Sequence, residues 1–227
     1  MAATATLAIY GTLFFAWLSG AAFAQTVDGS PETRALVAIV APVPGQKACF
    51  SRSYDAGHLR QNPKQQVTAM VFELLYVRIP SAEIQRYVFG MSAKLRARRD
   101  AVYASGQCET NVGAAYPAGN LCSVDCDGGG VSIEKIANSD AIYVHLDTPA
   151  NGIIMGPPCG EGPETRRMRL YAGADDKLFR LDRAPAAACR SLEHAVKFGN
   201  DTAKASSQVL QGEQYVRKRS GHGKNKI

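Results

Sequence analysis

Short apolar segments separated by turn residues recur along most of the chain. Tyr87, Phe89, Met91, Ala93 and Leu95 alternate with a second set of mostly small or polar residues. This period of two predicts a β-strand with one apolar face. The segment 67–77 is rich in Val, Leu, Phe and Tyr and lies between two prolines, which predicts a long neighbouring strand.

The same criteria predict further strands, and turn residues separate almost every pair of them. These strands are expected at 101–108, 121–126, 131–136, 141–147, 152–156, 167–172 and 177–182. Only short helices are predicted, at 54–61, 81–86 and 184–197. Short strands at this spacing favour an all-β, antiparallel fold. We expect a meander that closes into a barrel, because closure removes exposed strand edges, and a β-sandwich is the alternative.

The beginning of the chain has the pattern of an export signal. Its first 24 residues carry no charged side chain, run apolar from Leu7 to Leu18 and end in Ala22-Phe23-Ala24, a small-x-small cleavage pattern. We therefore expect a periplasmic or secreted protein with no transmembrane segment after cleavage. The alternative is a retained anchor, because the uncharged stretch 2–27 is long enough to span a bilayer.

The rest of the chain divides into three parts. Residues 25–45 are proline-rich and are predicted to be a lead-in segment, and residues 46–199 are predicted to be the barrel domain. Hydrophobic residues are 46% of the chain and charged residues 20%, a balance that allows a buried core. Residues 200–227 are predicted to be a disordered tail. That tail holds a cluster of positive charges, Arg217, Lys218, Arg219, Lys224 and Lys226.

The six cysteines are expected to form disulfides if the protein is exported, because thiols in an oxidising compartment are oxidised. Six cysteines allow fifteen pairings. We expect Cys49–Cys189 to join the ends of the domain, Cys108–Cys122 to join neighbouring strands, and Cys126–Cys159 to be the third pair. Zinc is disfavoured, because no histidine stands at a suitable offset from the Cys122 and Cys126 pair.

Two polar stretches are candidates for binding. Asp125 and Asp127 stand before three glycines and offer a weak calcium site, but the further carboxylates of a calcium loop are missing, so a tight turn is the preferred interpretation. Arg180 and Asp182 lie on a predicted strand, and Arg183 follows it. Guanidinium groups bind carboxylates and phosphates in a forked geometry, so these residues are candidates to hold an anion. The alternative is that these charges pair with one another on a solvated strand face.

Two further residues are candidate binding groups. His145 is out of phase with Val144 and Leu146 and stands beside Asp147, so it is a candidate base. Glu73 lies in an apolar strand, and if it points into the barrel it needs a partner such as Arg86 or Arg169. A nucleophile elbow, a metal-binding His-Glu-x-x-His helix, a phosphate loop and a dinucleotide fingerprint are all missing from the sequence.

Three segments of the chain resemble those of uncharacterised exported proteins of alphaproteobacteria. They are Cys-Phe-Ser-Arg-Ser-Tyr-Asp at 49–55, Cys-Ser-Val-Asp-Cys-Asp-Gly-Gly-Gly at 122–130 and Ala-Asp-Asp-Lys-Leu-Phe-Arg-Leu-Asp-Arg at 174–183. The resemblance covers most of residues 49–189. It implies a periplasmic location and carries no activity.

The sequence therefore predicts a non-catalytic β-domain that binds a small ligand or an envelope protein, with no catalytic residue and no cofactor. One alternative is a carboxylate-dependent hydrolase of envelope polymer, which requires two buried carboxylates facing one cleft. A second alternative is a structural protein tethered to an anionic surface by its basic tail. No element indicates specific nucleic-acid binding.

Overall fold

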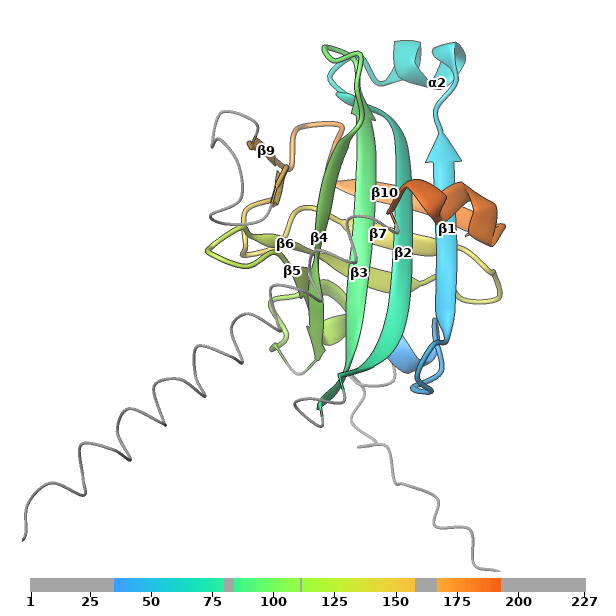
Figure 1. Ribbon diagram of the computed structural model, residues 1–227. Helices are drawn as coiled ribbons and strands as arrows, with labels where there is room; N and C mark the ends of the chain where they lie inside the picture. The colour runs from blue at the N-terminus through green and yellow to red at the C-terminus, as the bar shows by residue number, and fades with distance from the viewer. Residues whose placement is uncertain (1–34, 80–83, 111, 158–166, 193–227) are drawn as a thin grey trace, which may run out of the picture.

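Eight antiparallel strands close into a barrel in the computed structural model of the protein, which describes residues 35–79, 84–110, 112–157 and 167–192 (Figure 1). The strands follow one another around the barrel in the order β1 (Lys47–Ser53), β10 (Leu178–Ala184), β7 (Ile142–His145), β6 (Gly130–Lys135), β5 (Asn120–Ser123), β4 (Val102–Thr110), β3 (Ile84–Leu95) and β2 (Val67–Ile79). The antiparallel barrel predicted from the sequence is confirmed.

Strands and short helical segments also lie outside the barrel order in the described part of the chain, and residues 35–37 are helical as well. β8 (Ile153–Met155) and β9 (Met168–Leu170) pair with each other, and the other helical segments are α2 (Ala56–Gln61), η2 (Pro117–Gly119) and η4 (Ala186–Leu192). The helix predicted at 81–86 is wrong for its described part, because residues 84–86 begin β3 and Ile84 pairs with Ile79 across the hairpin. β1 was not predicted, since polar residues interrupt its short apolar run.

The alternation that predicted the strands sorts their side chains between the two faces of the barrel wall. In β2 and β3 the residues Phe72 and Phe89 point inward, and their rings stack with centroids 5.6 Å apart. Phe179 and Leu181 of β10 point inward in the same way, whereas Leu178 is 47% exposed.

Large side chains fill the interior of the barrel. Thirteen inward-facing residues are between 0 and 7% exposed: Phe50, Met70, Phe72, Leu74, Tyr87, Phe89, Met91, Val131, Ile133, Ile142, Val144, Phe179 and Leu181. A cavity wide enough for a ligand would expose the side chains that line it. An eight-stranded barrel is just wide enough for side chains to fill it. The described interior is therefore a packed core.

The barrel closes tightly between β4 and β5. A Cβ atom added to Gly106 would lie 1.9 Å from the carbonyl oxygen of Ser123, so only glycine allows these two backbones to approach this closely. The predicted disulfide Cys108–Cys122 joins the same two strands at a register pair, and is confirmed.

A second predicted disulfide, Cys49–Cys189, is also confirmed and holds η4 against the outside of β1. Both of its cysteines are buried, and they pack with Leu192 and with the partly buried Val71 in a small cluster outside the barrel. Cys126 is disulfide-bonded as well, but its predicted partner Cys159 lies outside the described residues.

Part of the predicted lead-in segment belongs to the core. Leu36 and Val40 are 0 and 4% exposed, and the hydroxyl of Tyr87 donates a hydrogen bond of 2.8 Å to the carbonyl of Val40. The predicted leader at 1–24 and the tail at 200–227 lie outside the described residues. Within the described part of the chain, no helix has the length and apolar character needed to cross a membrane.

Candidate functional site

The predicted site residues lie on the outer wall: β7 and β10 are neighbouring strands, with Leu178 opposite His145 and Arg180 opposite Tyr143, whereas Glu73 lies apart from them on β2. No hydrogen bond or ion pair joins His145 to Arg180 among the described residues. His145 is on the outer side of β7, Arg180 and Asp182 are on the outer side of β10, and Glu73 is on the outer side of β2. Each location therefore has to be assessed by its own contacts.

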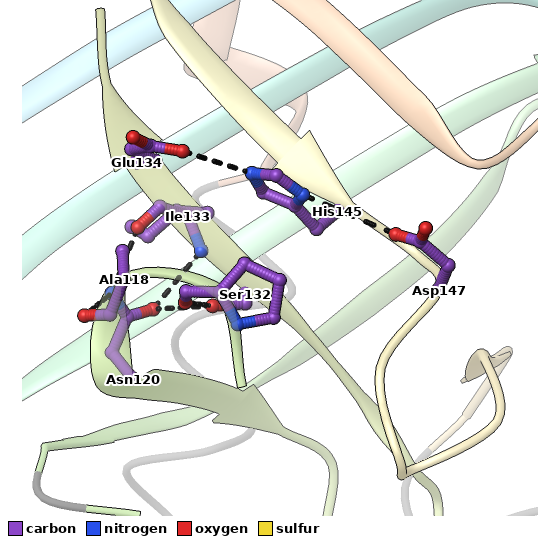
Figure 2. Close-up of polar contacts among 8 residues, drawn as sticks. Ala118, Asn120, Ser132, Ile133, Glu134, His145 and Asp147 are labelled. Atoms are coloured by element: carbon purple, nitrogen blue, oxygen red, sulfur yellow. Dashed lines mark hydrogen bonds and ion pairs between the residues drawn. The ribbon is translucent and has the colours of Figure 1, made fainter. Parts of the chain in front are cut away.

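His145 lies between two carboxylates on the outer wall (Figure 2). Its Nε2 is 3.2 Å from Oε2 of Glu134, and its Nδ1 is 3.9 Å from Oδ1 of Asp147. The imidazole is 15% exposed and both carboxylates are about half exposed. Because the carboxylates approach opposite nitrogens of the ring, the three groups do not converge on one point. No group of residues suited to hold a metal ion occurs among the described residues.

The residue opposite His145 in the sheet is Ser132, but its hydroxyl is not available as a nucleophile. Ser132 is fully buried, and its hydroxyl donates a hydrogen bond to the carbonyl of Pro117 in η2. Asn120 holds the same strand through two hydrogen bonds with the backbone of Ile133 (Figure 2). This polar cluster therefore fastens η2 and β5 to β6 and does not present an activated serine to His145.

Glu73 points away from the barrel interior, and yet its side chain is only 3% exposed. Its Oε1 lies 3.2 Å from Nζ of Lys47, an ion-pair contact without hydrogen-bond geometry, and neither Arg86 nor Arg169 is its partner. Its register partner is Cys49, so it lies beside the disulfide that holds η4. These contacts make Glu73 a structural ion-pair residue.

The second buried carboxylate is Asp176, and it is far from Glu73. Its two oxygens accept hydrogen bonds from the backbone N–H groups of Gln66 and Val67, at the start of β2. Burial raises the pKa of Asp176 despite these two bonds. Glu73 stands six residues further along the same strand, roughly 20 Å away at the rise of an extended chain. The described buried carboxylates do not face one cleft, as the hydrolase alternative requires.

The loop with Asp125 and Asp127 forms the tight turn preferred from its sequence. Cys126, Asp127 and Gly129 have positive φ values of 58°, 54° and 69°. The guanidinium of Arg169 donates to the carbonyl of Asp127 at 3.0 Å and reaches the carbonyls of Ala150 and Asn151 at 3.4 Å. A side-chain cation therefore occupies the position where these carbonyl oxygens converge.

A polar cluster that the sequence did not reveal caps one end of the barrel at α2. Gln65 donates to the carbonyl of Val67, which leaves its Oε1 to accept a hydrogen bond of 2.9 Å from Nε2 of His58. The ring of His58 stacks on Tyr54 with centroids 4.7 Å apart, and burial raises the pKa of Tyr54 to about 12. Asp55, whose side chain caps the helix by accepting from the N–H of His58, is the signal in the sequence for this element.

Arg180 and Asp182 form an ion pair on the outer wall, and a third residue joins them. Nη2 of Arg180 is 3.0 Å from Oδ1 of Asp182, and Nη1 of Arg52 is 3.4 Å from the other carboxylate oxygen. Arg183 lies apart from this group, with its guanidinium 5.3 Å from the ring centroid of Phe50. The group that contains Arg180 and Asp182 therefore includes Arg52, and Arg183, which the sequence analysis grouped with them, is not part of it.

No protein-family model, curated protein or solved structure matches this chain. A fold alone does not define a function, so the contacts of this chain's own residues have to indicate it.

Proposed function

We propose that this protein is an exported, non-catalytic β-barrel domain that binds a partner of the cell envelope on its outer surface. The observation that carries this proposal is the filled interior, where large side chains such as Phe72, Phe89 and Phe179 are at most 1% exposed. A small ligand has no described space inside the barrel, so recognition has to use the outer wall. Export into the periplasm or the medium is supported by the disulfides Cys49–Cys189 and Cys108–Cys122.

Binding is favoured over catalysis by the contacts of the candidate catalytic groups. His145 faces two carboxylates and a serine whose hydroxyl is engaged elsewhere. Glu73 and Asp176 lie at separate positions along β2, so the described residues do not supply the paired carboxylates of a glycoside hydrolase.

The test uses the mature chain, residues 25–227, with fractions of the host envelope. We expect saturable co-sedimentation with one fraction, such as cell-wall polymer, outer membrane or immobilised periplasmic proteins, and no release of soluble fragments from polymer. Failure to bind any fraction would overturn the proposal. Release of fragments that is lost in Glu73→Gln or Asp176→Asn would instead establish the hydrolase.

A further inference from the structure

The seam of the barrel between β1 and β10 carries two arginines that share one carboxylate. The described pairing of the two strands ends at Ser51 and Asp182. Beyond this pair, Arg52 follows on β1, and its guanidinium reaches Oδ2 of Asp182 at 3.4 Å. On β10, Nε and Nη2 of Arg180 lie 3.1 and 3.0 Å from Oδ1 of the same carboxylate. We call Arg52 and Arg180 the seam arginines.

The shared carboxylate leaves the seam arginines with donors to spare. Asp182 engages Nη1 of Arg52 and two nitrogens of Arg180, and in the described part of the chain the other guanidinium nitrogens of both residues make no hydrogen bond to protein. Two guanidinium groups against one carboxylate leave an excess of one positive charge. Glu134 lies in the same row of the sheet, on the far side of Tyr143, and its carboxylate contacts Nε2 of His145 at 3.2 Å and makes no described ion pair with Arg180.

The seam arginines are held in place while they remain accessible. Asp182 fixes both guanidinium groups, and the guanidinium of Arg52 also lies 5.6 Å from the ring centroid of Tyr54. Their side chains are 35 and 49% exposed. A side chain that is already oriented loses less conformational entropy when it binds, and a guanidinium recognises oxyanions through two parallel N–H bonds.

We infer that the seam arginines bind an oxyanion, a carboxylate or a phosphate group carried by the partner. This inference rests on the proposed function, because it names the chemistry by which the outer wall recognises an envelope component. Carboxylates and phosphates share the geometry that the forked donors require. Asp182 positions the two donors, and the partner's anion takes the hydrogen bonds that Asp182 leaves unused.

The test measures binding of inorganic phosphate and of acetate to the mature protein by NMR titration at constant ionic strength. We expect saturable shifts at backbone amides of β1 and β10 with at least one of the two anions, and the anion that binds more tightly identifies phosphate or carboxylate as the source. Arg180→Gln and Arg180→Lys are each expected to weaken binding about tenfold, since each removes the forked donor. Arg60→Gln, in the exposed helix α2, removes the same charge elsewhere and is expected to leave binding unchanged.

Three results would overturn the inference. These are a lack of saturable shifts in the wild type, equal weakening by Arg60→Gln, and full binding by Arg180→Lys, which would reduce the effect to unspecific charge. Envelope co-sedimentation separates this inference from the proposed function. If Arg180→Gln binds the envelope fraction as tightly as the wild type, the seam site is wrong and the function stands. If the wild type binds phosphate but no envelope fraction, the function is wrong.

Discussion

The disulfide Cys49–Cys189 is expected to stabilise the barrel more than Cys108–Cys122, because it closes a much longer loop. The two bonds join residues 140 and 14 positions apart. In the chain-entropy description, the longer loop corresponds to about 5 kcal/mol of stability and the shorter one to about 3 kcal/mol. The four sulfurs are all buried, so truncation to alanine removes similar packing at both sites.

The assay compares Cys49→Ala/Cys189→Ala with Cys108→Ala/Cys122→Ala in the mature chain. The single tryptophan, Trp17, lies in the predicted leader, so far-ultraviolet circular dichroism in urea is the suitable signal. The free energy of unfolding should fall by about 2 kcal/mol more in the first variant than in the second. If the first variant is unfolded without urea while the second is folded, the order is the same. Equal losses, or a larger loss for the shorter loop, would refute the reasoning.

Three further predictions concern single described residues, and a fourth concerns the basic tail. Gly106→Ala should lower the free energy of unfolding, measured in urea, by about 3 kcal/mol, because its Cβ would overlap the carbonyl of Ser123. The control Gly173→Ala should have little effect, because a Cβ there would have no atom closer than 3.6 Å. Similar losses in the two variants would contradict the close approach of β4 and β5. Because burial raises the pKa of Tyr54 to about 12, the stability that its hydroxyl contributes is present below pH 10 and is lost as the pH rises through about 12. Tyr54→Phe should therefore make the unfolding free energy fall less steeply in this alkaline range. An unchanged pH dependence would contradict the raised pKa. Lys47→Ala should destabilise the barrel by about 3 kcal/mol, because it removes the ion-pair partner of the buried Glu73 side chain, and Glu73→Gln should destabilise it by less in the same urea assay; the reverse order would contradict a stabilising role for this ion pair. The tethering alternative requires that deletion of residues 206–227 abolishes salt-sensitive association with anionic vesicles, and unchanged association would remove that alternative.

Most strands of the barrel were predictable because each buries one face, and a period of two then appears directly in the sequence. β1 lacks a clear period, since Lys47 and Ser51 flank the short run that carries Cys49 and Phe50. It is a strand because β2 and β10 pair with it on both sides. The burial of Leu36 and Val40 likewise depends on the barrel end that they contact, which no local pattern specifies.

The candidate site was less predictable than the fold, because its contacts join residues that are distant in sequence. Arg52 and Asp182 are 130 residues apart, and only the closure of the barrel brings β1 beside β10. The acidic partner of His145 that was predicted, Asp147, is its near neighbour, whereas Glu134 comes from the adjacent strand. Sequence spacing indicates which polar residues to consider and cannot supply the contacts between distant strands.

The arginines of this protein differ in how much of their hydrogen-bonding capacity the fold uses. Arg96 donates to the carbonyls of Gln65, Leu59 and Asn62 at 2.6 to 3.1 Å, and Arg169 serves three loop carbonyls in the same manner. Such a guanidinium neutralises converging backbone dipoles and has little capacity left for a ligand. In the described part of the chain, the hydrogen bonds of the seam arginines go to a single carboxylate, that of Asp182. A loop-binding arginine and a ligand-binding arginine look alike in the sequence, and the number of donors left unused by the fold is what distinguishes them.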